Sequence, residues 1–278
     1  MIDLRRNLAP VSAEAWARID REAQRVLKLH LAARKLVDFN GPLGWGASAL
    51  STGRVEKIQG PTEGVEGWRR RVLPLVELRV EFEVARAEID AIDRGAKEND
   101  LDTVVDAAKG IARAEDHAVF YGYGAAGMRG IIESAPHDAL QISEDYQAYP
   151  ATVSDALERL RQAGVDGPYA IALGPRCYAG LMRSFGPGGY PVYQHVRRLV
   201  DDRVVWAPAV DGAVVLSYAG GDYELTVGQD FSIGYLSHSD ASVRLYLIES
   251  FAFQVLTSEA AVALSYGAKS KNRGAIKV

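Results

Sequence analysis

Apolar residues near the start of the chain recur at steps of three and four, which predicts an amphipathic helix. Ser12 is placed to cap the first turn of this helix. We expect the helix to extend from Ser12 to about Lys35, ahead of a breaker at residues 40–42. Its apolar face comprises Trp16, Ile19, Ala23, Val26, Leu27 and Leu31.

Alternation of apolar and polar residues predicts half-buried β-strands in the later part of the chain. In Gly220–Tyr235, one strand ends at Val227 and a second begins at Phe231 after a turn. The alternation over Val243–Val255 is longer than a usual strand of about 5 to 6 residues, so we expect it to cross an elongated sheet. Further strands are expected over Val72–Phe82 and Tyr169–Leu173, and further helices over Asp102–Tyr121, Val153–Ala163 and Pro175–Arg183.

The segment Trp45–Pro74 contains five glycines after Trp45, scattered charges and only short apolar runs. A loop of this length without a core is uncommon in a compact domain. We therefore expect an extended arm or hairpin that packs against a neighbouring copy of the chain. Its basic run, Arg69-Arg70-Arg71, fits either a solvated face or a strip of ion pairs with that neighbour.

Composition and charge exclude several classes of protein. The 278 residues are 48% hydrophobic and carry a net charge of −4, so electrostatics does not imply nucleic acid or an anionic membrane as a partner. No run approaches the ~18 apolar residues of a spanning helix, and the N-terminus lacks the apolar core of a signal peptide. The single cysteine, Cys177, fits a reducing compartment. We therefore expect a cytoplasmic protein.

A glycine-rich run, YGYGAAG, matches part of a dinucleotide-binding loop through Gly122, Gly124 and Gly127. Such a loop must follow a strand and open a helix, so that backbone N–H groups reach the pyrophosphate. Here the run follows an expected helix. We interpret it as a helix terminator and expect no cofactor.

Two other clusters of reactive side chains are also weak candidates for a site. Glu115, Asp116 and His117 are consecutive on a helix and point in different directions, so a polar helix face is expected and a metal site is not. Cys177 and His195 could form a nucleophile and its base, but no nucleophile elbow or oxyanion loop surrounds them. No catalytic or metal-binding residue is therefore expected, and the chain is not expected to be an enzyme.

Several segments of the chain are distinctive when they are taken together and in order. They include LAP (Leu8–Pro10), RKLVDFNGPLGW (Arg34–Trp45), VLPLVELRVEF, AEDHAVFYG, GPYAIALGP and GGDYELTVGQDFSIGY (Gly220–Tyr235). In combination they resemble one known family, the encapsulins, which are bacterial nanocompartment shell proteins once labelled linocin or bacteriocin proteins. That family resembles the major capsid proteins of tailed phages. The resemblance extends from Leu8 to about Tyr266 and implies a self-assembling shell protein.

The resemblance implies an α+β fold of the HK97 phage-capsid type, built from named parts. These are an N-terminal arm and helix (1–40), an extended E-loop (41–74), a P-domain (75–135 and 223–266), an A-domain (136–222) and a basic tail (267–278). The tail fits either a solvated extension or an appendage that binds a neighbour. Copies are expected to close into an icosahedron, with the smallest type, T=1, as the default.

The resemblance also implies that a cargo enzyme is taken up through a short C-terminal peptide of its own. In the family this peptide docks on the lumenal side, between the N-terminal helix and the P-domain. The matching positions here are Leu27, Leu31, Arg34 and Asp38, with Phe231, Ile233 and Tyr235 opposite. An apolar patch with one paired charge suits an extended apolar peptide. Phe231 and Ile233 fit equally well as ordinary core residues beneath the helix.

A glycine-rich loop matches the position at which the family lines its five-fold pore. It comprises Ser184, Phe185, Gly186, Pro187, Gly188, Gly189 and Tyr190. Because the loop has little side chain and no fixed charge, we expect a pore for small solutes with weak ionic selectivity.

The usual guests of this family are ferritin-like proteins and dye-decolourising peroxidases, which implies a role in iron storage or in defence against oxidative stress. The expected partners are further copies of the chain and a cargo protein, with no nucleic acid or membrane. The alternative is a phage or prophage major capsid protein, which would share the fold and package DNA. The matching cargo-pocket residues favour the nanocompartment shell.

Overall fold

The computed structural model describes residues 4–267 and divides into two compact units. Unit 1 contains the residues up to Ser134 together with Gly220–Thr257. Unit 2 contains Ala135–Ala219 together with the residues from Ser258 onward. The basic tail expected over 267–278 lies, apart from Gly267, outside the described residues.

Unit 1 is built on a five-stranded sheet whose central member is a long strand, β11 (Ser242–Val255). Both β10 and β9 pair with one edge of β11, β10 along its first half and β9 along its last residues, while β4 pairs with the other edge. The expectation of one long strand that crosses an elongated sheet is confirmed. The other strands are β1 (Asp38–Asn40), β4 (Val76–Ala85), β9 (Tyr223–Val227) and β10 (Ser232–His238), and β1 pairs in parallel with β9.

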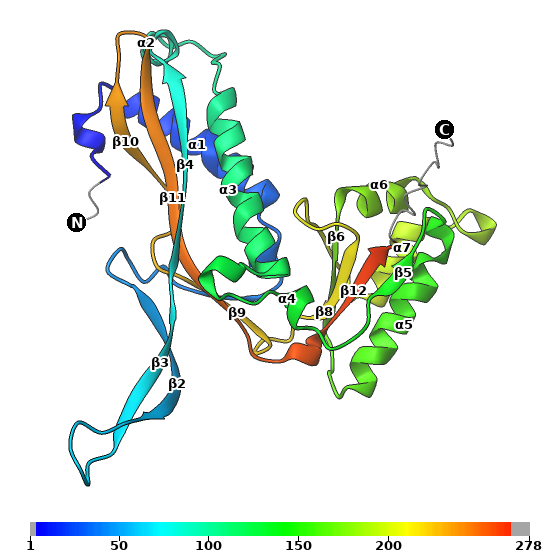
Figure 1. The fold of residues 1–278 in the computed structure, drawn as a ribbon. Coiled ribbons are helices and arrows are strands. Elements are labelled where there is room, and N and C mark those ends of the chain that lie inside the picture. The colour runs from blue at the N-terminus through cyan, green and yellow to red at the C-terminus, as the bar shows by residue number, and fades with distance from the viewer. Residues whose placement is uncertain (1–3, 268–278) are drawn as a thin grey trace, which may run out of the picture. The chain divides into compact units, whose positions relative to one another are not determined.

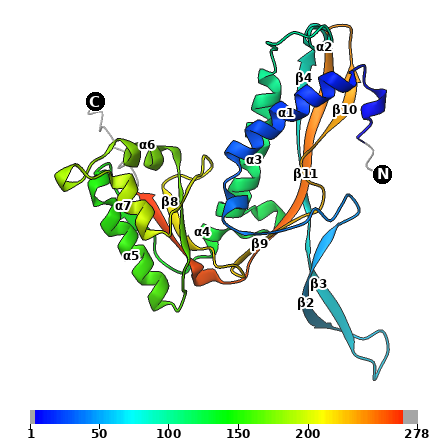
Figure 2. The ribbon, with the colours of Figure 1, turned by 180° about the vertical axis from the view of Figure 1, so that it is seen from behind.

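Helices cover one face of this sheet (Figures 1 and 2). They are α1 (Ala13–His30), α2 (Arg86–Asp93) and α3 (Asp102–Tyr121), followed by the short α4 (Ile131–Ser134). The apolar faces of α1 and α3 form one cluster with the sheet, in which Ile19, Ile111 and Leu245 have no exposed surface. This cluster is the hydrophobic core of unit 1.

Helix α1 begins where the sequence predicts and ends earlier. The Ser12 hydroxyl accepts a hydrogen bond from the Ala15 N–H at 3.0 Å, as expected of an N-cap. The α-helix ends at His30, and the expected extension to Lys35 is wrong. The buried Asp116 carboxylate accepts the N–H groups of Ala32 and Ala33, each at 2.9 Å, so these residues begin a separate 3₁₀ turn, Ala33–Lys35.

The expected arm is an antiparallel hairpin formed by β2 (Ala49–Ile58) and β3 (Gly67–Pro74). Its apolar side chains are poorly covered within the chain: Trp68 is 55% exposed and Val65 is 52% exposed. The basic run forms an ion pair inside the hairpin, between Arg69 and Glu56.

The expected strand Val72–Phe82 is divided into two by a short break. Strand β3 ends at Pro74, which has no N–H to donate, and β4 begins at Val76 in a different sheet. At the break, the Leu75 N–H donates to the carbonyl of Ser48, at the base of the hairpin. One continuous alternating pattern therefore contributes to two sheets.

Unit 2 is an α/β unit around a five-stranded mixed sheet of order β5-β12-β8-β6-β7. Its central strands, β6 and β8, are fully buried, as expected for apolar strands covered by helices. The strands are β5 (Leu140–Ile142), β6 (Tyr169–Leu173), β7 (Arg203–Trp206), β8 (Ala213–Ser217) and β12 (Ala261–Tyr266). The helices are α5 (Tyr149–Gln162), α6 (Pro175–Arg183) and α7 (Val192–Leu199).

The last strand, β12, lies in a different unit from the one that the sequence analysis assigns to it. Residues 223–266 were expected to form one part of unit 1 with 75–135. In the structure, β12 pairs with β8 and β5 in unit 2, and its first four residues are buried there. An apolar strand is stabilised in any sheet that buries its side chains, and the sheet of unit 2 buries β12.

Candidate functional site

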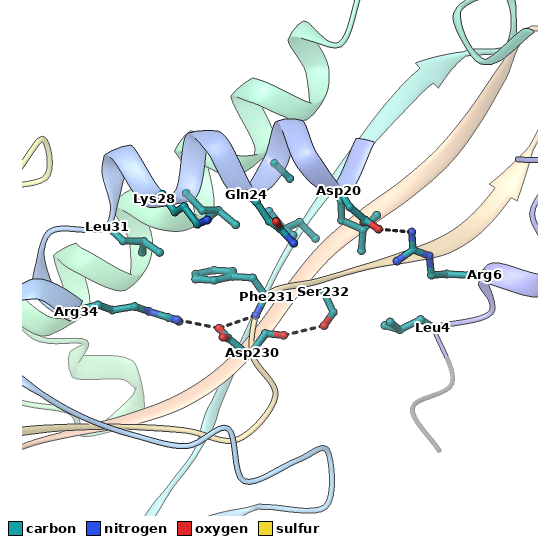
Figure 3. A pocket seen from close by; sticks show the side chains of 14 residues that line it. Leu4, Arg6, Asp20, Gln24, Lys28, Leu31, Arg34, Asp230, Phe231 and Ser232 are labelled. Atoms are coloured by element: carbon teal, nitrogen blue, oxygen red, sulfur yellow. Dashed lines mark hydrogen bonds and ion pairs between the residues drawn. The ribbon is translucent and has the colours of Figure 1, made fainter. Parts of the chain in front are cut away.

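A pocket of about 520 Å³ lies in unit 1 between α1 and the start of β10 (Figure 3). Its third side is the segment from Leu4 to Arg6, close to the described N-terminal end. The lining residues are Leu4, Arg6, Asp20, Ala23, Gln24, Leu27, Lys28, Leu31, Arg34, Asp230, Phe231, Ser232, Ile233 and Leu247.

Two periodicities produce the apolar wall of the pocket. Leu27 and Leu31 lie one turn apart on or just after α1, and therefore share one helix face. Phe231 and Ile233 are two residues apart at the start of β10 and therefore point to one side of the sheet. Ile233 is buried in the core cluster, whereas Phe231 is only partly buried and packs against that cluster. Ile233 therefore belongs to the core beneath the helix, and both side chains also line the pocket.

Charged groups lie at both ends of the pocket. At one end the Arg6 guanidinium pairs with the Asp20 carboxylate at 2.8 Å, and at the other Arg34 pairs with Asp230 at 2.8 Å. Figure 3 shows both ion pairs, with Gln24 and Lys28 of α1 between them. The pocket therefore combines an apolar wall with an ion pair at each end, and the Lys28 side chain also lines it.

The Arg34 side chain is held on its edges by carboxyl groups and on its faces by aromatic rings. Its Nε donates to the Glu115 carboxylate at 2.9 Å, its Nη1 donates to Asp230, and its Nη2 donates to Glu249 at 3.2 Å. The guanidinium carbon lies 4.6 Å from the ring centroid of Phe231 and 5.1 Å from that of Phe39. Arg34 is thus the central cation of this end of the pocket.

The expectation of an exposed polar helix face at Glu115 and Asp116 is wrong, because both side chains are fully buried. Glu115 points to Arg34, and Asp116 accepts the two backbone N–H groups that begin the 3₁₀ turn after α1. A buried acid is tolerated only when it is paired or hydrogen-bonded, and each of these acids has such partners far away in the sequence. His117 instead lies beside the ring of Tyr121.

Burial changes the protonation of two acids near Arg34. It raises the pKa of Asp116 to about 7, against the opposing effect of the hydrogen bonds from Ala33 and Ala32. Burial also raises the pKa of Glu249 well above its ordinary value, and the neighbouring Glu115 carboxyl adds to the effect. Removing these two side chains from water therefore favours their neutral forms.

Five of the seven residues expected for a peptide site line this pocket, namely Leu27, Leu31, Arg34, Phe231 and Ile233. The other two, Asp38 and Tyr235, are not among its lining residues. The Asp38 carboxylate accepts the N–H of Gly221, and the Tyr235 hydroxyl is hydrogen-bonded to His238.

The residues that the sequence analysis missed come from two sources. Asp20, Gln24 and Lys28 are spaced by four along α1, so the helical period that identified Leu27 and Leu31 could have identified them. Leu4 and Arg6 lie outside any periodic segment, and their place beside the pocket follows from the N–H of Tyr235 donating to the Leu4 carbonyl.

The glycine-rich loop at 184–190 belongs to unit 2 and closes on itself. Gly186 N–H donates to the Tyr190 carbonyl at 2.8 Å, and Gly188 and Gly189 both take positive φ angles of 77°. Phe185 is 55% exposed, and the loop contains no charged residue. A second pocket, of about 500 Å³, adjoins the loop and includes Tyr190 and His195 in its lining.

The other candidate clusters are not arranged as catalytic or cofactor sites. Gly122 caps the end of α3, so the glycine-rich run follows a helix. Tyr123 pairs with Met128 in an isolated bridge, and no strand leads directly into the run as a dinucleotide-binding loop requires. Cys177 is buried among tyrosines, with its sulfur 3.0 Å from the Tyr149 hydroxyl, and burial raises the pKa of its thiol. Among residues 4–267, no group of three His, Cys, Asp or Glu side chains could hold a metal ion, and no helix could cross a membrane.

Comparison with known proteins identifies a family and a fold. A family model described as "Encapsulating protein for peroxidase" matches residues 1–252. A type 1 encapsulin shell protein of Rhodospirillum rubrum is 53% identical over 270 residues, which cover 95% of this chain and 96% of that relative. Proteins with that name are shell proteins and not enzymes, in agreement with the expectation for this chain.

Solved structures of capsid-like particles have the same fold. The virus-like particle from Pyrococcus furiosus matches with a TM-score of 0.66 and 14% identity, covering 91% of this chain and 100% of that one. A structure of Microbacterium phage Oxtober96 matches with a TM-score of 0.58 and 12% identity, covering 85% of this chain and 91% of that one. The expected α+β fold of the HK97 phage-capsid type is confirmed.

Proposed function

Because the chain belongs to the encapsulin family of shell proteins, we propose that its copies close into a T=1 icosahedral shell that binds cargo through the pocket between α1 and β10. The observation that carries this proposal is the pocket itself, which brings an apolar wall and compensated charges together at the positions that the resemblance indicates. The ligand is a short, extended and largely apolar peptide at the C-terminus of a cargo protein.

The β2–β3 hairpin supports the assembly part of this proposal. Trp68, Val65 and Val72 are each about half exposed, although apolar surface of this kind is costly to leave in water. We assign the hairpin as the E-loop, which a neighbouring copy covers. Because the hairpin and the surface that receives it are different parts of the chain, the contact is heterologous and repeats around a closed shell.

The remaining parts of the chain are assigned in the same way. Unit 2 is the A-domain, and the rest of unit 1 is the N-terminal helix with the P-domain. The loop at 184–190 lines a pore for small solutes, whose uncharged side chains give weak ionic selectivity.

The chemistry of the pocket and the description of the family favour one class of cargo. A volume of about 520 Å³ accommodates a few side chains of an extended peptide and excludes a folded domain. The matching family is described as encapsulating a peroxidase, so a dye-decolourising peroxidase in the cytoplasm is the first choice of guest. This guest implies defence against oxidative stress. A ferritin-like guest, which implies iron storage, is the second choice.

The test is to co-express the chain with a fluorescent protein that ends in the C-terminal segment of a peroxidase encoded beside the shell gene. Electron microscopy of the purified material should show closed particles, and these should carry the fluorescence. Gln24→Trp fills the pocket from an exposed position and removes no core side chain, so particles should form and the guest should be lost. Leu29→Trp adds the same bulk to an exposed site on α1 outside the pocket and should keep the guest.

Three results would contradict the proposal. Protein that stays monomeric under mild conditions would contradict shell formation. Equal guest loading in the Gln24→Trp and Leu29→Trp shells would contradict binding of the guest in the pocket. Particles that contain DNA and exclude the guest would identify the alternative, a phage-type capsid.

A further inference from the structure

Three acids surround the Arg34 guanidinium at the charged end of the pocket. Arg34 is within hydrogen-bonding distance of Glu115, Glu249 and Asp230. Glu115 and Glu249 are fully buried and lie behind the pocket, on α3 and β11, whereas Asp230 lines it and is 42% exposed. Three ionised carboxylates around one guanidinium would leave uncompensated negative charge in the interior, which is costly.

The hydrogen bonds at this site show where a proton is needed. Glu249 Oε2 accepts from Arg34, and Glu249 Oε1 has no hydrogen-bond partner although it is buried. Protonation of one carboxyl of the Glu115–Glu249 pair reduces the excess negative charge and leaves a single buried carboxylate beside Arg34, with Asp230 partly exposed. It also lets the two carboxyls share a hydrogen bond, as two acids beside each other do when one is neutral.

Arg34 transmits this arrangement to the pocket wall. Asp230 Oδ1 accepts from Arg34 Nη1 at 2.8 Å and also from the backbone N–H of Phe231 at 2.9 Å. The same guanidinium lies against the Phe231 ring. Figure 3 shows this chain of contacts from Arg34 through Asp230 to Phe231. The position of the aromatic wall therefore depends on how tightly Arg34 is held from behind.

We propose that Glu115 and Glu249 are positioning residues for the pocket, which share one proton and hold Arg34 so that Asp230 and Phe231 stay in place for the peptide. This inference rests on the proposed peptide-binding function, and it adds two residues that do not line the pocket. Loss of the shared proton adds a negative charge beside Arg34, draws its guanidinium toward the buried pair and weakens its bond to Asp230.

The direction of the pH dependence follows from the burial of Glu249. Its raised pKa means that the proton is lost at a higher pH than from an ordinary glutamic acid. Peptide binding should therefore be strongest while the pair holds its proton and should weaken as the pH rises. The charged or titratable groups near this site are Arg34, Glu115, Asp230, Asp116 and Lys35.

The test measures guest loading into whole shells at a series of pH values. Shells are dissociated in denaturant and reassembled with the peptide-tagged fluorescent protein, and guest fluorescence is divided by shell protein after size-exclusion chromatography. Loading should fall by about tenfold from the acidic to the alkaline end of the series, the scale expected when one charge-assisted hydrogen bond is weakened. The same guest without its peptide corrects for trapping.

Two variants distinguish a positioning role from a merely structural one. Glu249→Gln keeps the shape and is permanently neutral, so it should load as well as wild type at the acidic end of the series and should not lose guest at the alkaline end. Glu77→Gln removes an exposed carboxyl from the adjacent strand β4, opposite Ser250, and should keep the wild-type profile. A flat wild-type profile, or an unchanged fall in Glu249→Gln, would overturn the inference and leave the pocket intact as a peptide site. Wild-type shells that assemble but take up no guest at any pH would contradict the proposed peptide site as well.

An infrared measurement on wild-type shells needs no variant to fold. The C=O band of the protonated pair should persist to a higher pH than that of an ordinary glutamic acid and should disappear over the same pH range in which loading falls. Asp116 contributes a second component, which should disappear near its own pKa of about 7. A pair that loses its band in the range of an ordinary glutamic acid would overturn the inference.

Discussion

The core of unit 1 and the β2–β3 hairpin use apolar side chains in opposite ways. In the core, Ile19 and Ile111 are completely buried by other parts of the same chain. In the hairpin, Trp68 and Val65 are half exposed, and within the described part of the chain nothing covers them further. The comparison indicates that the core stabilises one subunit, whereas the apolar side chains of the hairpin contribute to stability only if another copy covers them, as proposed above.

The largest effect should follow from a cavity in the core. Ile111→Ala removes a fully buried side chain from the cluster shared by α1, α3 and the sheet, and should lower the free energy of unfolding by about 2–5 kcal/mol. Urea unfolding followed by circular dichroism measures this change. Val105→Ala, at a partly buried position on the same helix, is the matched control and should cost about 1 kcal/mol or less. Equal losses in the two variants would contradict this account of the core.

A substitution in the hairpin should affect assembly and leave the subunit folded. Trp68→Ala removes an exposed side chain whose burial by a neighbour would contribute about 1.5–3 kcal/mol in each copy. Size-exclusion chromatography with light scattering should show the loss of particles, while the circular dichroism spectrum stays unchanged. Trp68→Phe should retain most of the assembly. Normal particles from Trp68→Ala would show that the hairpin has a different role.

The smallest loss of stability should come from weakening the buried hydrogen bonds that follow the end of α1. This change leaves the buried apolar area intact, so it should cost less than removing a core side chain. Asp116→Asn keeps one acceptor oxygen for the two N–H groups of Ala32 and Ala33, and should cost about 1–2 kcal/mol.

The same variant should change the pH dependence of stability. The raised pKa of Asp116, about 7, means that folded protein holds a proton that unfolded protein releases, so this group's contribution is full at acidic pH and is lost as the pH rises toward 7. Unfolding midpoints of the variant at about pH 5 and about pH 8 should therefore differ less than those of wild type. An equal difference would assign the pH dependence to other groups.

Elements with a strong local period were predictable from the sequence. Helix α6 has the expected bounds, Pro175–Arg183, since proline is favoured in the first helical turn. Strand β11 begins one residue before the expected range and ends where expected. Helix α5 begins at Tyr149 and not at Val153, because Pro150 also lies in its first turn. In each case neighbouring residues along the chain carry the relevant information.

The candidate site was only partly predictable, since its polar half depends on distant residues. Arg34 and Glu115 are 81 positions apart, and Arg34 and Glu249 are 215 positions apart. The resemblance to the encapsulins indicated Leu27, Leu31, Phe231 and Ile233 as neighbours, and local spacing accounts only for the shared face within each pair. Local spacing gave no sign that two acids beside His117 turn inward, because only a partner across the core makes burial of a charge tolerable.

The order of residues along the chain was enough to predict which segments form helices and strands, which of their faces are apolar, and which segment lacks a core. Those properties depend on interactions between residues a few positions apart. Three results came only from the folded chain: β12 joins unit 2, α1 ends at His30 where the Asp116 carboxylate binds the following N–H groups, and three carboxyls meet at Arg34. Each of these results requires groups that are distant along the chain to satisfy one another's hydrogen bonds or charge, and a local pattern contains no record of such partners.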